Sequence, residues 1–342
     1  MAKDLRCDSC GGNRIFDPSN GVLLCEHCGK TQRIYDSNTN ENTNLTRKYT
    51  LSYTLEPRNN DNYQYLCSSC GTTVSFEEKE DKKRCPSCGA TTLNRQNRAV
   101  YVPDGILPFA ISRDQAADIF RKWIASRKFA PNDLKQMAKL GKISGIYLPT
   151  WNFSFRLVGS YNAAVTKVIE LGNERFYSRH LTVSNKIEKA YTNVLISGNS
   201  RITDETLDEI EPFEAVKIKP YSSEYIYGFS GIDTNMDIHK QYEDMIYEKK
   251  QSIISRIRID LKSRYDTIER LDTNIVPKGA CFNYLYVPIW ANHYTYNGKE
   301  YHCYINGQTG KATGKSPKSF WKIFSLIAGI VAGVGLFVML FL

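Results

Sequence analysis

Four Cys-x-x-Cys-Gly units lie within the first ninety residues, and they limit what this part of the chain can fold into. Two cysteines three positions apart can point both thiolates at one metal ion, and the glycine that follows fits the tight turn between them. In each of two pairs of units, fourteen residues separate the second cysteine of one unit from the first cysteine of the next, and the second pair repeats the first at an offset of sixty. This spacing is typical of structural zinc sites with four cysteine ligands. We therefore predict two structural zinc ions (Zn2+), held by Cys7, Cys10, Cys25 and Cys28 and by Cys67, Cys70, Cys85 and Cys88.

Disulfide bonds and iron are the alternatives to zinc. Disulfides stabilise small secreted domains, but Met-Ala-Lys-Asp-Leu-Arg at the start of the chain lacks the apolar region of a secretory signal. Four thiolates also suit an iron site of the rubredoxin type, and the spacing alone does not distinguish the two metals. Zinc is favoured because no flavin or haem motif accompanies the cysteines. We expect His27, between two cysteines, to be a solvated turn residue rather than a ligand.

Each cysteine module is about thirty residues long, which is below the roughly 40 residues that a chain needs to fold on hydrophobic burial alone. Bound zinc contributes an apparent ~10–16 kcal/mol to such modules, so we expect them to fold only with metal. The sequence predicts zinc ribbon 1 over residues 1–36, a polar linker over 37–62 and zinc ribbon 2 over 63–98. Within the linker, residues 49–55 alternate as a strand would.

The other end of the chain is strongly apolar. Residues 323–342 read IFSLIAGIVAGVGLFVMLFL, without a charged side chain, and as a helix this length crosses a bilayer core. We expect residues 320–342 to form a transmembrane tail anchor. Lysines precede the apolar segment and no acidic residue follows Glu300, so we expect a single pass through the cell membrane with the N-terminal region in the cytoplasm. Ser325, Gly329 and Gly333 are small residues at four-residue spacing that would allow a homodimer through this helix.

Charge helps to separate the classes of partner. The formal net charge is +9, and four of those charges are the lysines before the apolar segment, which leaves +5 for the rest of the chain. Nucleic-acid-binding proteins usually carry a basic face, because their affinity depends on phosphate contacts. A nucleic-acid partner is therefore unfavoured, and a membrane-tethered nucleic-acid-binding protein remains the alternative function.

Residues 99–319 form the bulk of the protein, and their pattern predicts an α+β domain of helices and antiparallel sheet. Ser112 to Gln115 form a capping box ahead of a helix. Residues 145–200 resemble a series of strands, 238–261 one long helix, and 267–313 strands again, with a hairpin-turn signal at Asn306-Gly307.

One pattern occurs twice in this domain. YLPTW at 147–151 returns as YVPIW at 286–290, which predicts two similar lobes over 99–200 and 231–313. The proline in each copy predicts an edge strand or a bulge. The surrounding aromatic residues are expected in the core, with a peptide-binding groove as the alternative.

No arrangement of residues predicts enzyme activity. His180, His239, His293 and His302 are scattered along the sequence, and no nucleophile-base pair follows from spacing. The two remaining cysteines, Cys281 and Cys303, are expected to face each other across strands as reduced core thiols.

Taken together, the twin cysteine modules, LPFAISRDQAADIFRKWI, GIYLPTWNFSF and YLYVPIWANHYTYNGKEYHCYINGQTGK resemble a family of bacterial membrane-anchored double zinc-ribbon proteins, also labelled TFIIB-type zinc-ribbon or primosomal-protein-N′-like. The helicase activity of the second label would need a Walker A loop, and Thr309-Gly310-Lys311-Ala312-Thr313-Gly314-Lys315-Ser316 lacks its first glycine. Genes of the family often lie near those of flotillin-like or phage-shock-type membrane-stress proteins, which implies protein partners of that kind. The expected function is thus a non-enzymatic membrane adaptor or scaffold.

Overall fold

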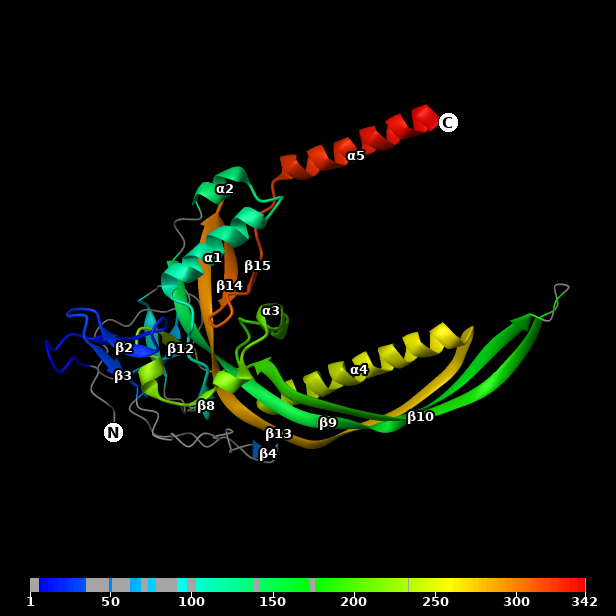
Figure 1. Cartoon of the computed structure of the whole chain (residues 1–342), viewed down its shortest axis with the longest axis horizontal. Helices are drawn as coiled ribbons and strands as arrows, with labels where there is room; N and C mark the ends of the chain where they lie inside the picture. Colours follow the sequence, from blue (N-terminus) through cyan, green and yellow to red (C-terminus); the bar gives the residue numbers. More distant parts are fainter. Residues whose placement is uncertain are drawn as a thin grey trace.

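The computed structural model of this chain describes residues 6–34, 49–50, 62–68, 73–77, 91–96, 103–137, 142–170, 172, 176–232 and 234–341. Its architecture is mixed helix and antiparallel sheet, as the sequence predicts (Figure 1). The strands are β1 (Arg14–Asp17), β2 (Val22–Cys25), β3 (Thr31–Arg33), β4 (Tyr49–Thr50), β5 (Asn62–Cys67), β6 (Thr73–Glu77), β7 (Leu93–Gln96), β8 (Gly105–Ile106), β9 (Lys142–Glu170), β10 (Phe176–Ser197), β11 (Lys219–Pro220), β12 (Ser230–Ile232), β13 (Thr267–Tyr296), β14 (Lys299–Asn306) and β15 (Ala312–Gly314). The helices are α1 (Arg113–Ser126), α2 (Asn132–Met137), α3 (Asp204–Ile210), α4 (Ile238–Arg264) and α5 (Phe320–Phe341), with 3₁₀ turns η1 (Ala215–Lys217) and η2 (Ser223–Tyr225).

Two sheets organise the described residues. A small sheet joins β1, β2 and β3 of the first cysteine module. The large sheet follows the order β11-β8-β13-β9-β12-β6-β5-β7, with β10 beside β9 and β14 beside β13. Because β6 pairs with β12, strands that the sequence assigns to the second cysteine module continue the sheet of the α+β domain.

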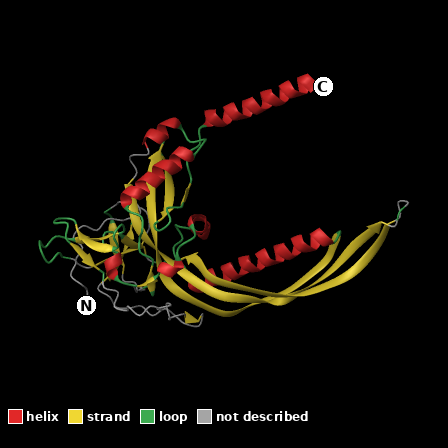
Figure 2. Cartoon of the chain, in the orientation of Figure 1, coloured by secondary structure: helices red, strands yellow, loops and turns green. Residues whose placement is uncertain are grey.

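Three long antiparallel strands extend from the body as a curved arm, and α4 lies along it (Figure 2). Alternating residues of β9 face the helix, so that Tyr161, Ala163 and Val165 are buried with Leu261 of α4. Gly159 lies where β9 and β13 approach closely, because a Cβ atom there would be 1.8 Å from the backbone oxygen of Asn274. The side chain of Asp237 caps α4 by accepting a hydrogen bond from the backbone N–H of Lys240.

The capping box predicted ahead of α1 is confirmed. Ser112 accepts from the N–H of Gln115, and the Gln115 side chain accepts from the N–H of Ser112. The helix that follows buries Ala116, Phe120, Trp123 and Ile124 against the large sheet.

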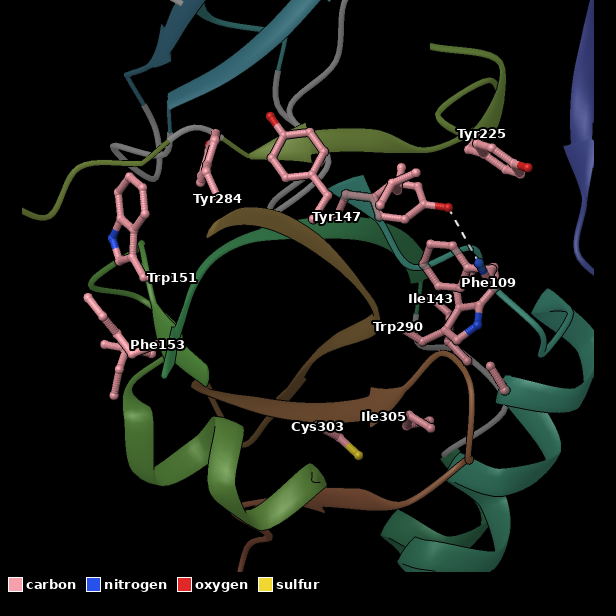
Figure 3. Packing of buried hydrophobic residues seen from close by; sticks show 14 of the residues in the cluster. Phe109, Ile143, Tyr147, Trp151, Phe153, Tyr225, Tyr284, Trp290, Cys303 and Ile305 are labelled. Carbon is pink, nitrogen blue, oxygen red and sulfur yellow. Dashed lines mark hydrogen bonds between the residues drawn. The ribbon is translucent and has the colours of Figure 1, made fainter. Parts of the chain in front are cut away.

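Aromatic side chains fill the main core. Phe109 stacks on Phe229 with ring centroids 4.2 Å apart. The N–H of Phe109 also donates to the hydroxyl of Tyr147, at 3.4 Å (Figure 3). Trp151 and Trp290 are 1 % and 4 % exposed, so the aromatic residues of the repeated pattern lie in the core, as expected.

The prolines of this pattern do not lie at edge strands or bulges, and that prediction is wrong. Pro149 is on β9 and Pro288 on β13, and these two strands pair with each other through both prolines. On the other side of β9 the partner changes from β12, which ends its pairing at Tyr147, to β10, which begins at Thr150. β13 changes from β8 at Tyr286 to β14 at Ile289 in the same way. Each proline therefore lies where one neighbouring strand ends and the next begins, so its missing N–H breaks no ladder.

The two segments predicted as similar lobes share one sheet instead of standing apart. The order β8, α1, β9, β10 is matched by β12, α4, β13, β14, and the short first strand of each segment pairs in parallel with the long strand of the other. This reciprocal pairing is consistent with duplication, which stays a prediction.

The expected pairing of Cys281 with Cys303 is wrong. Cys281 on β13 lies opposite Ser154 of β9, with its Sγ atom 3.6 Å from the Ser154 backbone oxygen. Cys303 on β14 lies opposite Asn292 and is buried. The long β13 strand places the two thiols at different levels of the sheet.

Candidate metal centre

The four cysteines of the first module come together, as their spacing predicts. Their sulfur atoms all lie within 4.8 Å of one another, with Cys7 3.6 Å from Cys28 and Cys10 3.5 Å from Cys25. Four sulfurs at about 2.3 Å from a tetrahedral zinc ion would be separated by roughly 3.8 Å. The donor set and its size therefore fit a metal ion of this kind, and His27 is not part of the cluster.

Backbone turns build this cluster from the two Cys-x-x-Cys-Gly units. The N–H of Gly11 donates to the oxygen of Cys7 and the N–H of Gly29 to that of Cys25, each closing a turn that ends with φ of 68° and 74°. Only glycine adopts this left-handed conformation without strain, which explains the residue after each pair. Gly12 has no room for a side chain, because a Cβ atom would lie 2.8 Å from the Cβ atom of His27 and 3.3 Å from the sulfurs of Cys10 and Cys25.

The turns also favour thiolates. The backbone N–H of Ser9 is the main cause that lowers the pKa of Cys7 to about 6, and the N–H of Cys28 lowers the pKa of Cys25. The backbone N–H of Gly12 likewise lowers the pKa of Cys10. Hydrogen bonds with the neighbouring thiols, above all that of Cys28, outweigh this effect and raise the pKa of Cys10 to about 12. Such crowding of sulfurs is typical of sites in which a cation compensates the charge of several thiolates.

The first module is docked on the body of the protein. Phe16 of β1 is 2 % exposed and packs against Tyr225 and Phe229, and its N–H donates to the oxygen of Tyr227 at 2.8 Å. Gly228, with φ of 86°, lets the chain pass close to Ile15. The metal centre is thereby joined to the segment that leads into β12 and the large sheet.

The second predicted centre is described only in part. Cys67 lies on β5 and is fully buried, whereas Cys70, Cys85 and Cys88 lie outside the described residues. The strand of Cys67 pairs with β6 and β7. A second metal ion remains a prediction from the spacing.

The structure brings together two histidines that the sequence analysis treated as scattered. His293 of β13 and His302 of β14 are directly paired, with their Nδ1 atoms 2.6 Å apart. The two-residue turn between them is Asn297-Gly298, with φ of 49° and 74°, as in a type I′ turn. Asn306-Gly307 begins the longer loop of the next hairpin, between β14 and β15. The sequence contains a signal for this pairing. Asn297-Gly298 is a typical two-residue hairpin turn, and His293 and His302 lie at equal distances on either side of it.

The other two histidines have different surroundings. His180 on β10 lies on the open face of the arm, with Nδ1 2.9 Å from the Thr166 hydroxyl and 2.8 Å from a Glu269 carboxylate oxygen. His239 lies in the first turn of α4, away from this group.

At the far end, α5 is long and apolar enough to cross a membrane. Residues Phe320–Met339 have a mean hydropathy of 2.2, and none of the most apolar window is buried inside the protein. The helix leaves the body beside the α1–α2 loop, where the N–H of Ser319 donates to the oxygen of Phe129 and Lys322 Nζ donates to the oxygen of Ala130.

Comparison with known proteins gives a relative without a described function. The chain is similar to the uncharacterized protein YdjG of Bacillus subtilis (strain 168), with 25% identity over 336 residues that cover 97% of this chain and 95% of that protein. No family model matches the sequence. No solved structure matches it. The aligned region spans nearly the full length of both proteins.

Proposed function

We propose that this chain is a non-enzymatic membrane adaptor whose zinc-bearing modules dock protein partners at the cytoplasmic face of the membrane. The observation that carries the proposal is the placement of its two most distinctive parts. A module whose four clustered cysteines could hold a metal ion is fixed to the body near one end of the chain, and an exposed apolar helix of membrane-spanning length lies at the other.

The apolar helix supports membrane anchoring. Leu, Ile, Val and Phe side chains are exposed on every face of this helix. Contact of such an apolar surface with water costs free energy, whereas contact with lipid does not. Trp321 is 75 % exposed at its beginning, where the amphipathic indole ring suits the headgroup region. Lys315, Lys318 and Lys322 cluster at the same end, which favours the cytoplasmic side for the body.

The first cysteine module suits a docking role because it is rigidly held yet half open. Cys7 and Cys25 are buried, while Cys10 and Cys28 are exposed. The exposed surface around them includes Glu26 and Arg33, and Phe16 fixes the opposite side of the module to the body. A metal in such a site stabilises a surface rather than catalysing a reaction, because a closed set of four thiolates leaves no open coordination position.

The kind of partner follows from the family resemblance described above. Flotillin-like or phage-shock-type membrane proteins are the proposed class. Zinc, rather than iron, is proposed for both modules, with the ligands of the second being Cys67, Cys70, Cys85 and Cys88.

Site-specific photocrosslinking in native membranes tests this function. A photoreactive residue replaces Arg33 on the module in one variant and Ser184 on the arm in a control, and crosslinked proteins are identified by mass spectrometry. We expect a membrane-assembly protein at position 33 that is absent at position 184 and lost when Cys10 is replaced by Ser. Recovery of the same proteins from both positions, or none from either, contradicts the adaptor role.

Nucleic-acid binding is the alternative outcome. The full chain in detergent is mixed with duplex and single-stranded DNA at about 150 mM salt, where weak nonspecific phosphate contacts are largely lost. We expect no retardation of either DNA. Retardation that depends on the cysteines would replace the adaptor function by the membrane-tethered nucleic-acid-binding one.

A further inference from the structure

A shallow pocket of about 180 Å3 lies on the face of the large sheet opposite α1. Its lining comes from four strands and one loop: Ile146, Arg201, Ile202, Ile232, Ala291, His293, His302 and Tyr304. The apolar members form a buried floor, with Ile146, Ile202 and Ala291 between 1 % and 2 % exposed. The rim is polar and consists of Arg201, the histidine pair and Tyr304.

The loop that carries Arg201 is held by a network of hydrogen bonds. Asn199, which is 2 % exposed, accepts from the N–H of Arg201 through its side-chain oxygen. Asn235 accepts from the N–H of Ser200 and donates to the Ser200 hydroxyl, and its own N–H donates to the oxygen of Gly198. Ile202 is buried next to the arginine. The guanidinium is therefore presented from a backbone that is already ordered, which lowers the entropic cost of binding.

The histidine pair supplies a hydrogen-bond donor to the pocket. Burial is the main cause that lowers the pKa of His293 to about 4, and the nearby charges of His302 and Arg201 act in the same direction. His293 is thus neutral near pH 7, and a contact of 2.6 Å between the two Nδ1 atoms requires one ring to donate and the other to accept. The ring whose Nδ1 accepts carries its own proton on Nε2, so at least one Nε2–H donor remains for a ligand.

Arg201 sets the sign of the charge that the pocket accepts. No carboxylate of the described residues lies within ion-pair distance of its guanidinium, and none lines the pocket. The unpaired positive charge opposes a metal cation at the neighbouring imidazoles, although two histidines alone would suit one. A planar guanidinium instead matches the two oxygens of a carboxylate or a phosphate. Burial raises the pKa of Tyr304, so its hydroxyl stays protonated and adds a donor.

We propose that this pocket binds a small oxyanion, a carboxylate or a phosphate group, with Arg201 as the main anchor and the His293–His302 pair and Tyr304 as further hydrogen-bonding groups. The isoleucine floor accommodates an apolar part of the molecule that carries the anion. The site is independent of the adaptor function, because it uses neither the cysteine modules nor the apolar helix.

Thermal unfolding and calorimetric titration of the full chain in detergent test the proposal. Sodium phosphate, sodium acetate and sodium chloride are compared at equal ionic strength, for the wild type, Arg201→Ala and Arg179→Ala. Arg179 is a matched control because it is an exposed arginine on the arm, remote from the pocket. We expect saturable binding of phosphate or acetate that Arg201→Ala weakens roughly ten- to hundredfold and Arg179→Ala leaves unchanged, as for the loss of a charge-assisted hydrogen bond.

The comparison between salts also identifies the anion. Binding of phosphate alone assigns a phosphate group, binding of acetate alone a carboxylate, and binding of both a general oxyanion site. The proposal is overturned if chloride has the same effect as phosphate and acetate, or if the Arg201→Ala variant binds these anions as tightly as the wild type. If Arg201→Ala does not fold, Arg201→Lys keeps the charge without the planar fork and is expected to bind several-fold more weakly, with Tyr304→Phe as a second variant. Unchanged affinity in these two variants overturns the proposal as well.

Discussion

The ring of Phe16 meets the ring of Tyr225 edge to face, with centroids 5.3 Å apart and an interplanar angle of 74°. This contact joins the cysteine module to the segment before β12, and Phe229 of the same segment stacks on Phe109 in the main core. The cysteine cluster and the packing of the body are therefore physically connected.

Replacing Phe16 by Ala should separate the module from the body. Phe16 is 2 % exposed, and truncation of a buried phenylalanine typically costs about 3–5 kcal/mol of unfolding free energy. We expect a lower thermal midpoint and faster amide exchange at Tyr225 to Phe229. Phe176→Ala is the matched control, since Phe176 is 66 % exposed at the tip of the arm and should change neither quantity.

Metal analysis of the purified chain should find two zinc ions per molecule. Cys10→Ser should remove one ion, because three thiolates bind zinc more weakly than four, and Cys67→Ser should remove the other. Elemental mass spectrometry measures zinc and iron in the same sample. Ser9→Ala, which keeps all the cysteines, should retain both ions; a single ion in the wild type would refute the second site.

Gly159→Ala should disturb the arm at its middle. The new Cβ atom would meet the backbone oxygen of Asn274 at 1.8 Å, and backbone cannot rotate away as a side chain can. We expect a loss of about 1–3 kcal/mol of stability, as for overpacking, with faster proteolysis of β9 and β13. Limited proteolysis followed by mass spectrometry locates the cuts. Ser160→Ala, on the exposed neighbouring position, should leave the pattern of cuts unchanged.

Stability should depend on pH through Glu211. Burial raises the pKa of its carboxyl from the usual 4.5 to about 7, and Asp208 adds to this, against the charges of Lys249 and Lys311. Between these two pH values the folded chain holds a proton that the unfolded chain has lost, so this group makes stability fall as pH rises through the window.

Glu211→Gln removes that dependence because the amide does not ionise. We expect the variant to match the wild type near pH 4.5 and to unfold at a higher temperature than the wild type at pH 8. Thermal scans at the two pH values measure the difference. Glu243→Gln on the exposed side of α4 should show no such gain, and a gain of equal size at both pH values for Glu211→Gln would contradict the assignment.

Charges introduced into α5 should release the protein from the membrane. Ile330 and Val334 are 57 % and 58 % exposed, and each lysine at the centre of a spanning helix costs about 2.5–3.5 kcal/mol. We expect the double variant Ile330→Lys, Val334→Lys to move from the carbonate-resistant membrane fraction to the supernatant. The double variant with leucine at both positions should stay in the membrane fraction, and a lysine variant that also stays there would argue against anchoring by this helix.

Much of the metal site could be predicted from the sequence because its determinants are local. The Cys-x-x-Cys-Gly turn needs only five consecutive residues, and it brings Cys7 and Cys10 to one point whatever lies around them. The capping box at Ser112 and the length and composition of α5 are likewise properties of short segments.

The tertiary structure decided the features that depend on pairing between distant strands. The position of Pro149 and Pro288 in the centre of the sheet, the separation of Cys281 from Cys303 and the contact of His293 with His302 all follow from the register of β9, β13 and β14. A shift by one residue turns every side chain to the other face, and no short-range pattern sets such a register over strands of this length. The sequence alone thus determined the cysteine turns and the apolar helix, whereas the docking of Phe16 and the oxyanion pocket arise only where residues far apart in the chain meet.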